Sequence, residues 1–386
     1  MAGPLTGIKV VELGVWVAGP AAGGILADWG ADVIKIEPPA GDPARMFGAM
    51  LRLEPGVNPP FEMDNRSKRS IVLDLATEDG VRVAFELLAD ADVFVTNVRP
   101  AALQRLGLDF DAVAERNPRL VYGLITGYGV AGPDADRAAY DVAAFWSRAG
   151  VADLLTRPGD TPPFQRGGMG DHSAAMTLAG AICAALVARQ QTGAGQFVTT
   201  SLYRQGAYTV SFDLNTLLLT GRQIAIGQRE SMGNPCMNNY AAGDGRRFWI
   251  VGLDGERHWP ALCRAAGRTD WLDDPRFATA RARAVNASLL VVELDAVFAT
   301  KPLDDWAEIF ATEPDFFWSP VNSIEDVLAD DQFHAAGGVV YVPDGESSQP
   351  MVATPADFGG TPWEPRRPAP RLGEHTDEIL SELAGS

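Results

Sequence analysis

The chain has 386 residues, of which 46% are hydrophobic and 21% charged, and its formal net charge is −18. These proportions are typical of a globular protein with room for one large domain or two smaller ones. The strong negative charge argues against nucleic acid or an anionic membrane as a partner, but it leaves room for a local basic pocket.

Apolar strand-like runs alternate with helical stretches over the first 130 residues, and this alternation predicts the fold class. The predicted strands are 8–13, 32–37, 70–75, 93–97 and 120–125. Thr77 is expected to cap one of the intervening helices. A β-α-β-α order with strands buried on both faces predicts an α/β protein with a doubly wound parallel sheet. Ligands of such sheets bind at the carboxyl ends of strands, where Gly14–Pro20, Asn97 and Thr126–Gly129 fall.

Two groups of cations lie beside the predicted strands. Arg66, Lys68 and Arg69 come just before the third strand, and Arg99 and Arg105 follow the fourth. Each group is either a solvated turn or part of an anion site. Two basic groups at neighbouring loops of one sheet would suit a polyphosphate.

The amino-acid composition and the pattern of predicted elements change after about residue 225. We expect a large domain formed by residues 1–224, a smaller α+β domain over 225–330, and a C-terminal segment, 331–386. The smaller domain is predicted to contain a strand over 246–253 and helices over 259–266 and 284–300. The C-terminal segment is rich in proline and is expected to be extended, ending in a short helix capped by Thr376.

Asp171 stands between a glycine-rich stretch, 166–170, and a run of Ala and Leu that predicts a buried helix. Asp171 or Ser173 is therefore expected at or near the helix N-cap. A carboxylate there is close to free backbone N–H groups and to the positive end of the helix dipole. From these residues alone, Asp171 is either a helix cap or a functional carboxylate.

The sequence argues against metal sites and against several well-known catalytic and nucleotide-binding motifs. Cys183, Cys236 and Cys263 lack metal-binding spacing and the four histidines are scattered, so we expect no metal. No P-loop, G-x-S-x-G elbow or H-E-x-x-H motif is present, and the glycines of 14–24 do not match a dinucleotide fingerprint. Sparse cysteines, no signal-peptide pattern and charge-free runs shorter than a membrane span predict a cytoplasmic protein without a membrane partner.

Ordered motifs along nearly the whole chain resemble the class III acyl-CoA transferases, the CaiB/BaiF family. This family includes formyl-CoA transferase, carnitine CoA-transferase and α-methylacyl-CoA racemase. The matching segments are Val17–Pro20, Leu26–Glu37, Gly41–Pro43, Asn65–Leu75, Leu106–Gly107, Asn117–Leu120, Thr126–Gly129, Gly170–Asp171, Thr192–Gln196, Asp274–Phe277, Ser319–Ser323 and Pro370–Asp377.

The resemblance implies a Rossmann-like large domain built from both chain ends, a small domain, and a homodimer of two interlocked subunits. It also implies that Asp171 is the nucleophile of a CoA transfer from an acyl-CoA to a small carboxylic acid. A carboxylate with a reference pKa of about 3.9 is ionised at neutral pH and needs no base to attack a thioester. The intermediates would be an aspartyl anhydride and then an aspartyl-CoA thioester.

The resemblance further implies which residues contact coenzyme A, which is a substrate here; no permanently bound cofactor is expected. Tyr140 would lie near the thiol, with Asp141 beside it in the catalytic site. Pro38 and Ser231–Pro235 depart from the family pattern, at a nucleotide contact and at the loop that shields the intermediate. The expected CoA contacts are Trp16, Val17, Ala18, Lys68, Arg69, Asn97, Val98, Arg99 and Arg105, with Arg137 as an additional cation.

Two alternatives to CoA transfer stay open. The racemases of the family use a histidine followed by an aspartate, where this chain has Tyr140-Asp141. A phenol does not titrate near neutral pH as an imidazole does, so transfer is favoured over 2-methylacyl-CoA racemisation. His172 could be offered as a substitute base. A non-catalytic acyl-CoA-binding protein is the other alternative, and Asp171 in its glycine-rich setting argues against it.

Overall fold

The computed structural model describes residues 3–224, 228–231 and 233–385. It divides into two compact units, described separately below. The large unit is formed by residues 1–224 and 334–386, so both ends of the chain contribute to it, and the small unit is formed by residues 225–333.

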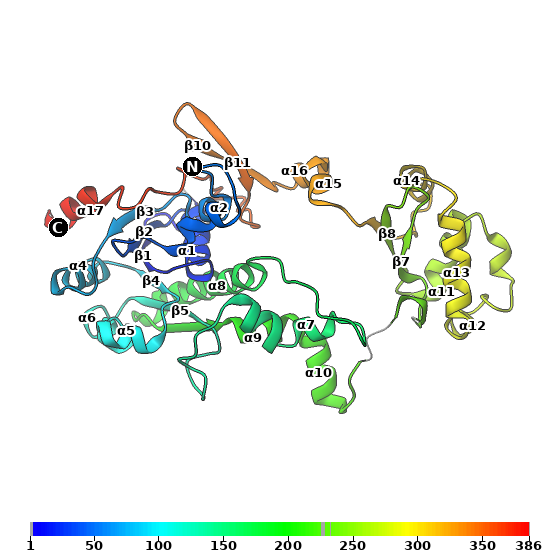
Figure 1. Ribbon diagram of the computed structural model, residues 1–386, viewed down its shortest axis with the longest axis horizontal. Helices are drawn as coiled ribbons and strands as arrows, with labels where there is room; N and C mark the ends of the chain where they lie inside the picture. The colour runs from blue at the N-terminus through cyan, green and yellow to red at the C-terminus, as the bar shows by residue number, and fades with distance from the viewer. Residues whose placement is uncertain (1–2, 225–227, 232, 386) are drawn as a thin grey trace. The chain divides into compact units, whose positions relative to one another are not determined.

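A six-stranded, fully parallel sheet forms the centre of the large unit (Figure 1). Its strand order is β3-β2-β1-β4-β5-β6, so the order reverses between β1 and β4. In open parallel sheets the crevice at such a reversal is the usual ligand site. The strands are β1 (Lys9–Leu13), β2 (Asp32–Glu37), β3 (Arg69–Val72), β4 (Val93–Thr96), β5 (Val121–Thr126) and β6 (Phe197–Ser201).

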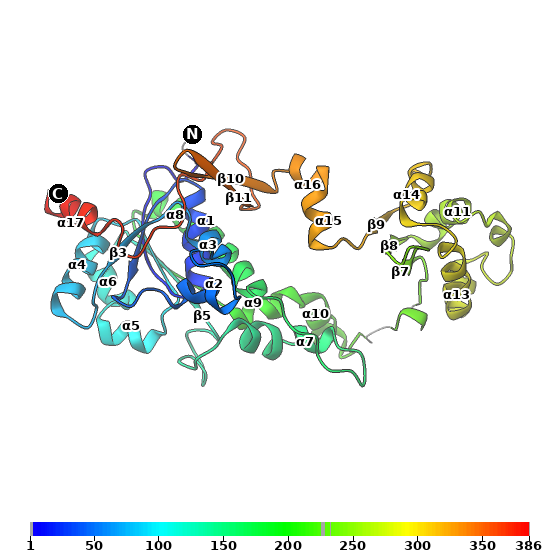
Figure 2. The same ribbon diagram turned by 45° about the horizontal axis from the view of Figure 1, so that its top comes forward.

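Helices cover both faces of the sheet, as Figure 2 shows from a second direction. One hydrophobic core joins the sheet to α1 (Ala18–Asp28) and α8 (Met169–Thr192). The core on the opposite face includes residues of α4 (Glu78–Ala89), α5 (Pro100–Leu106), α6 (Phe110–Arg116) and α17 (Thr376–Ala384). The mixed α/β class and the parallel sheet expected from the sequence are therefore confirmed.

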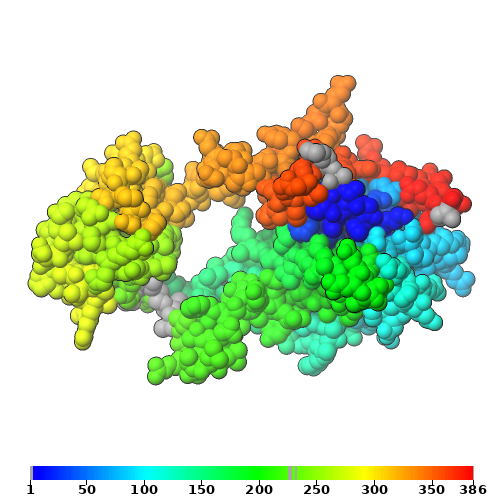
Figure 3. Space-filling model, turned by 180° about the vertical axis from the view of Figure 1, so that it is seen from behind, coloured from blue at the N-terminus to red at the C-terminus, as the bar shows by residue number. Residues whose placement is uncertain are grey.

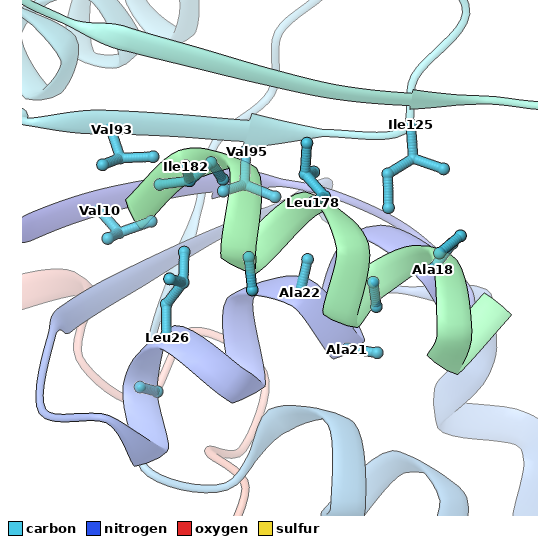
Figure 4. Close-up of a cluster of buried hydrophobic side chains, with 14 of the residues drawn as sticks. Val10, Ala18, Ala21, Ala22, Leu26, Val93, Val95, Ile125, Leu178 and Ile182 are labelled. Carbon is cyan, nitrogen blue, oxygen red and sulfur yellow. The ribbon is translucent and has the colours of Figure 1, made fainter. Parts of the chain in front are cut away.

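Helix α8 is the one helix of the described chain that is long and apolar enough to cross a membrane. Counting charge-free residues alone did not reveal this, because the charge-free run is shorter than the helix. The polar residues that flank the run leave the mean hydropathy of the helix high enough for a membrane span. Leu178 and Ile182 of α8 pack against strand residues such as Val95 and Ile125 (Figure 4). Its apolar character is accounted for by this packing in the core.

The remaining elements of the large unit lead to and follow these two helices. Thr77 caps α4 as expected, accepting a hydrogen bond from Gly80 N at 3.1 Å. These elements are η1 (Pro43–Met46), α2 (Phe47–Met50), α3 (Pro59–Asn65), a π-helical turn η2 (Val142–Arg148), α7 (Val151–Leu154), α9 (Leu202–Thr209) and α10 (Ser211–Thr220).

The C-terminal segment is less extended than the sequence predicts. It forms an antiparallel hairpin, β10 (Val339–Asp344) with β11 (Ser347–Val352), that the prolines did not suggest. Thr376 is the first residue of α17 and not its cap, because its hydroxyl accepts a hydrogen bond from Val72 N on β3. This contact ties the end of the chain to the sheet.

The small unit is a three-stranded antiparallel sheet with helices packed around an aromatic core. The predicted strand and both predicted helices of this region are present with shifted bounds. Its elements are η3 (Arg229–Ser231), β7 (Met237–Ala241), β8 (Arg247–Val251), α11 (Gly255–Ala265), η4 (Thr269–Leu272), α12 (Ala280–Val285), α13 (Ala287–Phe298), α14 (Leu303–Ala311), β9 (Trp318–Pro320) and α15 (Ile324–Ala329); α16 (Asp331–Ala335) follows at its boundary.

Candidate active site

Asp171 lies in the first turn of α8, and glycines make this position possible. The helix cap is Gly168, whose φ of 77° is a left-handed conformation that favours glycine. A side chain on Gly170 would collide with Asp141 Oδ1 at 2.2 Å and with Phe145. The sequence placed Asp171 or Ser173 at or near the cap. Asp171 does lie near the cap, although the cap itself is a glycine, and Ser173 donates a hydrogen bond to Gly170 O within the first turn.

Asp141 provides the side-chain hydrogen bonds that a capping role for Asp171 would have supplied. Its Oδ2 accepts hydrogen bonds from the backbone N–H groups of Gly170, at 3.0 Å, and Asp171, at 3.4 Å. Its Oδ1 is buried and has no hydrogen-bond partner among the residues that the structure describes. Because Asp141 satisfies these first-turn donors, the Asp171 carboxyl group is not needed as a cap and is free for another role.

The surroundings of Asp171 make its carboxyl group less acidic than the sequence suggests. Burial, and then the nearby Asp141 carboxylate, raise the pKa of Asp171 to about 7. The folded protein therefore makes this carboxyl group harder to ionise than the reference pKa implies. The reference value applies to a solvated aspartate, whereas this one is largely removed from water.

His172, the next residue of α8, is hydrogen-bonded to a buried aspartate. Its Nε2 lies 3.0 Å from Oδ1 of Asp64 on α3, whose side chain is buried. Burial would lower the pKa of His172, but the Asp64 hydrogen bond and the carboxylates of Asp64, Asp171 and Asp141 outweigh it and raise that pKa. An imidazolium beside Asp171 opposes the effect of Asp141.

The loop after β1 is held at the sheet's reversal point by two side chains from different parts of the chain. Asn97, after β4, accepts a hydrogen bond from Val15 N and donates one to Val15 O. Asp42 Oδ1 accepts a hydrogen bond from the N–H of Trp16, whose φ of 64° is unusual for a non-glycine residue. The expected CoA residues Val17 and Ala18 follow directly, at the start of α1.

Ring contacts connect this loop to the region of Asp171. The ring of Trp16 meets the ring of Tyr140 edge-on, with centroids 6.0 Å apart. Tyr140 is 63% exposed and precedes Asp141, which binds the first turn of α8. The structure therefore brings together four residues expected from the sequence: Trp16, Tyr140, Asp141 and Asp171.

The basic group before β3 is placed differently from the expectation. Lys68 is fully buried, and its ammonium group contacts Glu12 Oε2 at 2.6 Å, Pro20 O and Asn65 Oδ1. Arg69 lies at the amino end of β3, where its guanidinium pairs with Asp32 and with Glu378 and Glu382 of α17. Both cations are already satisfied inside the chain, which contradicts the expectation that they bind phosphates.

The cations after β4 and β5 are accessible. Arg99 and Arg105 are exposed, and within residues 3–224, 228–231 and 233–385 neither side chain belongs to an ion pair. Arg137 is also exposed, 3.6 Å from Asp134 and close to the ring of Tyr128. Val98 lies between β4 and Arg99, its N–H bonded to Thr96 Oγ1.

A cavity of about 710 Å³ runs along α4, from the loop after β3 to the end of α6, and Arg105 is one of its lining residues. Its apolar walls come from Leu75, Phe85 and Leu106, and Arg116 lies over the ring of Phe85 at 3.5 Å. Sequence reasoning missed this cavity, because Phe85 and Arg116 belong to helices α4 and α6 and carry no motif of their own.

Sequence reasoning also missed the polar residues that lie under the site. Lys35 is fully buried and contacts both Glu12 Oε1 and Asp42 Oδ2 at 2.9 Å. With Lys68 and Asp64 these side chains form a buried group between β1, β2 and α3. The only sequence signal was the position of Lys35, Asp42 and Lys68 within segments that match the family; Glu12 and Asp64 lie outside those segments. Of the expected lid, Ser231 and Gly233–Pro235 belong to the small unit, and Met232 lies outside the described residues.

Comparisons with known proteins give one consistent result. Residues 5–376 match the family model described as CoA-transferase family III. The chain is 33% identical to (R)-2-hydroxy-4-methylpentanoate CoA-transferase of Clostridioides difficile, over 98% of this chain and 95% of that one. It is 34% identical to cinnamoyl-CoA:phenyllactate CoA-transferase of Clostridium sporogenes, over 98% of this chain and 93% of that one.

Solved structures agree with this result. A CaiB/BaiF family protein from Brucella suis superposes with a TM-score of 0.87 at 32% identity, covering 99% of this chain and all of the other (100%). Rv3272 from Mycobacterium tuberculosis superposes with a TM-score of 0.86 at 28% identity, covering 98% and 99%. The chain belongs to CoA-transferase family III, the CaiB/BaiF family.

Proposed function

We propose that this protein is a class III CoA-transferase that moves coenzyme A from an acyl-CoA to a carboxylic acid, with Asp171 as the nucleophile. One observation carries the proposal. Asp171 has a carboxyl group that is released from capping by Asp141, in a first turn connected through Tyr140 to the loop at the sheet's reversal point. The membership of the chain in CoA-transferase family III supports the same activity.

The first half-reaction removes CoA from the donor. The Asp171 carboxylate attacks the thioester carbonyl carbon, the C–S bond breaks, and CoA leaves as a thiolate, so that a mixed anhydride remains. The thiolate then attacks the aspartyl carbonyl carbon of this anhydride. The C–O bond to the donor acyl group breaks, which releases the donor acid and leaves Asp171 as a CoA thioester.

The second half-reaction uses the same chemistry in reverse. The acceptor carboxylate attacks the Asp171 thioester, expels the CoA thiolate and forms a new anhydride. The thiolate attacks the acceptor carbonyl carbon, which yields the acceptor acyl-CoA and restores the Asp171 carboxylate. Every step exchanges one nucleophile for one leaving group, so no external base is required.

The accessible cations support a proposed position for the rest of CoA. We place its phosphates near Arg99 and Arg105 and its nucleotide in the adjoining cavity, which has the volume typical of a small-molecule site. Trp16, Val17 and Ala18 would line the path of the pantetheine arm toward Tyr140 and Asp171. Asn97 has its amide bonded to Val15, so it positions this loop. Lys68 and Arg69 are not part of this binding site.

The activity is tested by measuring CoA exchange from a panel of acyl-CoAs to labelled acids by mass spectrometry. The panel should include 2-hydroxy acids, because two relatives are named for such substrates. The wild-type enzyme should label at least one acid, and Asp171→Ala should not. Asp171→Ala should keep the wild-type circular dichroism and still bind CoA. Full activity of the Asp171→Ala variant would overturn the proposal.

Racemisation is tested by deuterium uptake at the α-carbon of a 2-methylacyl-CoA in heavy water, without an acceptor acid. Transfer predicts no enzyme-dependent exchange at a rate comparable to turnover. Such exchange would reverse the ranking of the two activities. Tight acyl-CoA binding with no exchange and no transfer for any substrate of the panel would favour a non-catalytic binding protein.

We also propose that the enzyme is a homodimer, and the surface of α10 supports this. None of the described residues of α10 is buried, and Phe212, Leu218 and Leu219 are more than three-quarters exposed. The space-filling view shows the green atoms of this part of the chain at the surface of the large unit (Figure 3). A second copy is the occupant that the family resemblance implies for such an apolar helix.

Light scattering should give twice the chain mass, and Leu218→Glu with Leu219→Glu should lower the mass or the solubility. If the subunits interlock, dilution alone should not separate them. A wild-type monomer at all concentrations would overturn the dimer.

A further inference from the structure

The pair formed by His172 and Asp64 has no part in the chemistry described above, yet it lies directly beside the nucleophile. His172 follows Asp171 in the first turn of α8, and its Nε2 is 3.0 Å from Asp64 Oδ1. Asp64 is 4% exposed, whereas the His172 side chain is 38% exposed. The aspartate is therefore fixed in the protein interior, and the imidazole bridges it to the edge of the site.

A buried aspartate needs a compensating charge or hydrogen-bond donors. Lys68 is the nearest alternative cation, but its ammonium group is in contact with Glu12, Pro20 and Asn65. Burial raises the pKa of Asp64, and the hydrogen bond from His172 is the main interaction that opposes this rise, so Asp64 depends on His172 for a direct partner. A protonated imidazole satisfies this need best, because a charge-assisted hydrogen bond is stronger than a neutral one.

Among the described residues, the charges that act on Asp171 are those of Asp141, His172 and Asp64, and of these only His172 can be a cation. Asp141, before η2, is an anion, and Glu12 on β1 is paired with Lys35 and Lys68. On the helices packed against α8, Asp28 of α1 is paired with Arg66 and Arg148 of η2 with Asp134. Arg204 of α9 is exposed, and it has no ion pair within the described chain.

We propose that His172 is a positioning residue that keeps Asp171 ionised: Asp64 holds the imidazole in its charged form, and the imidazolium stabilises the neighbouring carboxylate. This inference rests on Asp171 being the nucleophile. It assigns the pair an electrostatic role and not that of a base, because Nε2 is already committed to Asp64.

The role predicts a specific pH dependence. Asp171 attacks only as a carboxylate, so kcat/KM for the acyl-CoA falls on the acid side as Asp171 becomes protonated. Removing the His172 cation makes Asp171 harder to ionise. The fall of kcat/KM on the acid side, called the acid limb below, therefore moves to higher pH. Loss of the His172 charge at high pH has no such cost, because Asp171 is ionised there already.

The decisive comparison is between two substitutions of the same residue. His172→Gln removes the charge and should shift the acid limb upward by about one pH unit, the lower end of what one neighbouring charge does. Activity would fall about tenfold on the acid side and little on the alkaline plateau. His172→Lys keeps a cation and should restore the limb toward its wild-type position. His258→Gln, in the small unit, is the matched control and should leave the limb unchanged.

A second measurement does not depend on activity. The chain has four histidines, so the titration of His172 can be followed by NMR and assigned by its loss in His172→Gln. Asp64→Asn should lower the pH at which His172 titrates. An unchanged midpoint would show that Asp64 does not hold the charge, and would overturn the proposal even if a variant at position 172 failed to fold.

The outcomes separate this proposal from the one on which it rests. If Asp171→Ala retains activity, the nucleophile is wrong and both proposals fall. If Asp171→Ala is inactive but the pH profiles of His172→Gln and wild type coincide, only the role of His172 is overturned. The same holds if His172→Lys shifts the limb as much as His172→Gln, because the charge then has no influence.

Discussion

The two ends of the parallel sheet use their arginines in opposite ways. At the amino end, Arg66 pairs with Asp28 and Arg69 with Asp32, and the C-terminal segment closes over both through Val352 and α17. At the carboxyl end, Arg99 and Arg105 are exposed and have no ion pair within the described residues, and Arg105 lines a cavity. Similar clusters of cations therefore serve folding at one end and are available to a ligand at the other.

The difference follows from which carboxylates lie near each cluster. Asp28 and Asp32 end α1 and begin β2, so the topology delivers them to the amino end. A buried guanidinium must be paired there, because an unpaired charge in the interior is costly. At the carboxyl end the cations can remain solvated until an anion arrives.

The largest effect is expected from a substitution that breaks the Arg66–Asp28 ion pair at the amino end of the sheet. Arg66→Met should lower the free energy of unfolding by about 3–5 kcal/mol, because it leaves the buried Asp28 carboxylate without its partner. Both side chains are only 2% exposed, and Thr354 also donates its hydroxyl to Asp28. Urea denaturation measures the change. Arg82→Met, which breaks an exposed pair with Glu86, is the control and should have no measurable effect. A loss for Arg66→Met below about 1 kcal/mol would contradict this account.

A smaller effect is expected at the carboxyl end, and of a different kind. Arg105→Gln should raise KM for acyl-CoA about tenfold, as loss of one charge-assisted contact to a phosphate does, with little change in kcat or stability. Arg99→Gln should act in the same way.

Arg69→Gln is the matched comparison from the other end of the sheet. It should lower stability and leave KM unchanged, because its guanidinium is engaged with Asp32 and α17. If Arg69→Gln raises KM and the two carboxyl-end variants do not, the assignment of the two ends is reversed.

The smallest effect concerns the cost of keeping Asp171 in its site. Its carboxyl group binds a proton more tightly in the folded chain, where its pKa is about 7, than in the unfolded chain, where a value near 4 is expected. Stability therefore falls as pH rises through this window. A pKa difference of about three corresponds to about 4 kcal/mol, but Asp171 retains some exposure and solvent screens its charge. Asp171→Asn should therefore be more stable than wild type by about 1–2 kcal/mol at pH values above about 7.5 and equal to it near pH 4. Urea denaturation at both pH values measures the difference in unfolding free energy between Asp171→Asn and wild type. A difference that is the same at both pH values would show that the ionisation of Asp171 does not cause it.

The parallel sheet and its functional end could be predicted from the sequence because the signals are local. Alternating apolar runs gave five of the strands, and Gly14–Pro20 and Asn97 fall where strands end. Strand β6 was missed because Phe197–Ser201 is half-buried and rich in Thr and Ser, and lies at the edge of the sheet.

The roles of individual cations could not be predicted, because they depend on partners far away in the chain. In the sequence, the basic stretch around Lys68 indicates a surface cation. Only the fold brings Glu12 into contact with it. The capping of α8 by Asp141 is equally non-local, since Asp141 and Gly170 meet only when η2 packs against α8. The raised pKa of Asp171 follows from that same contact and from burial.

The central claim is that Asp171 becomes covalently bonded to substrate. The most direct test is to incubate the enzyme with an acyl-CoA donor, trap it with hydroxylamine and locate the modified residue by mass spectrometry of its peptides. We expect a hydroxamate on Asp171 that appears only with acyl-CoA and is absent from Asp171→Asn. Modification of a different carboxylate, or an unmodified Asp171 under conditions in which the enzyme transfers CoA, would contradict the account.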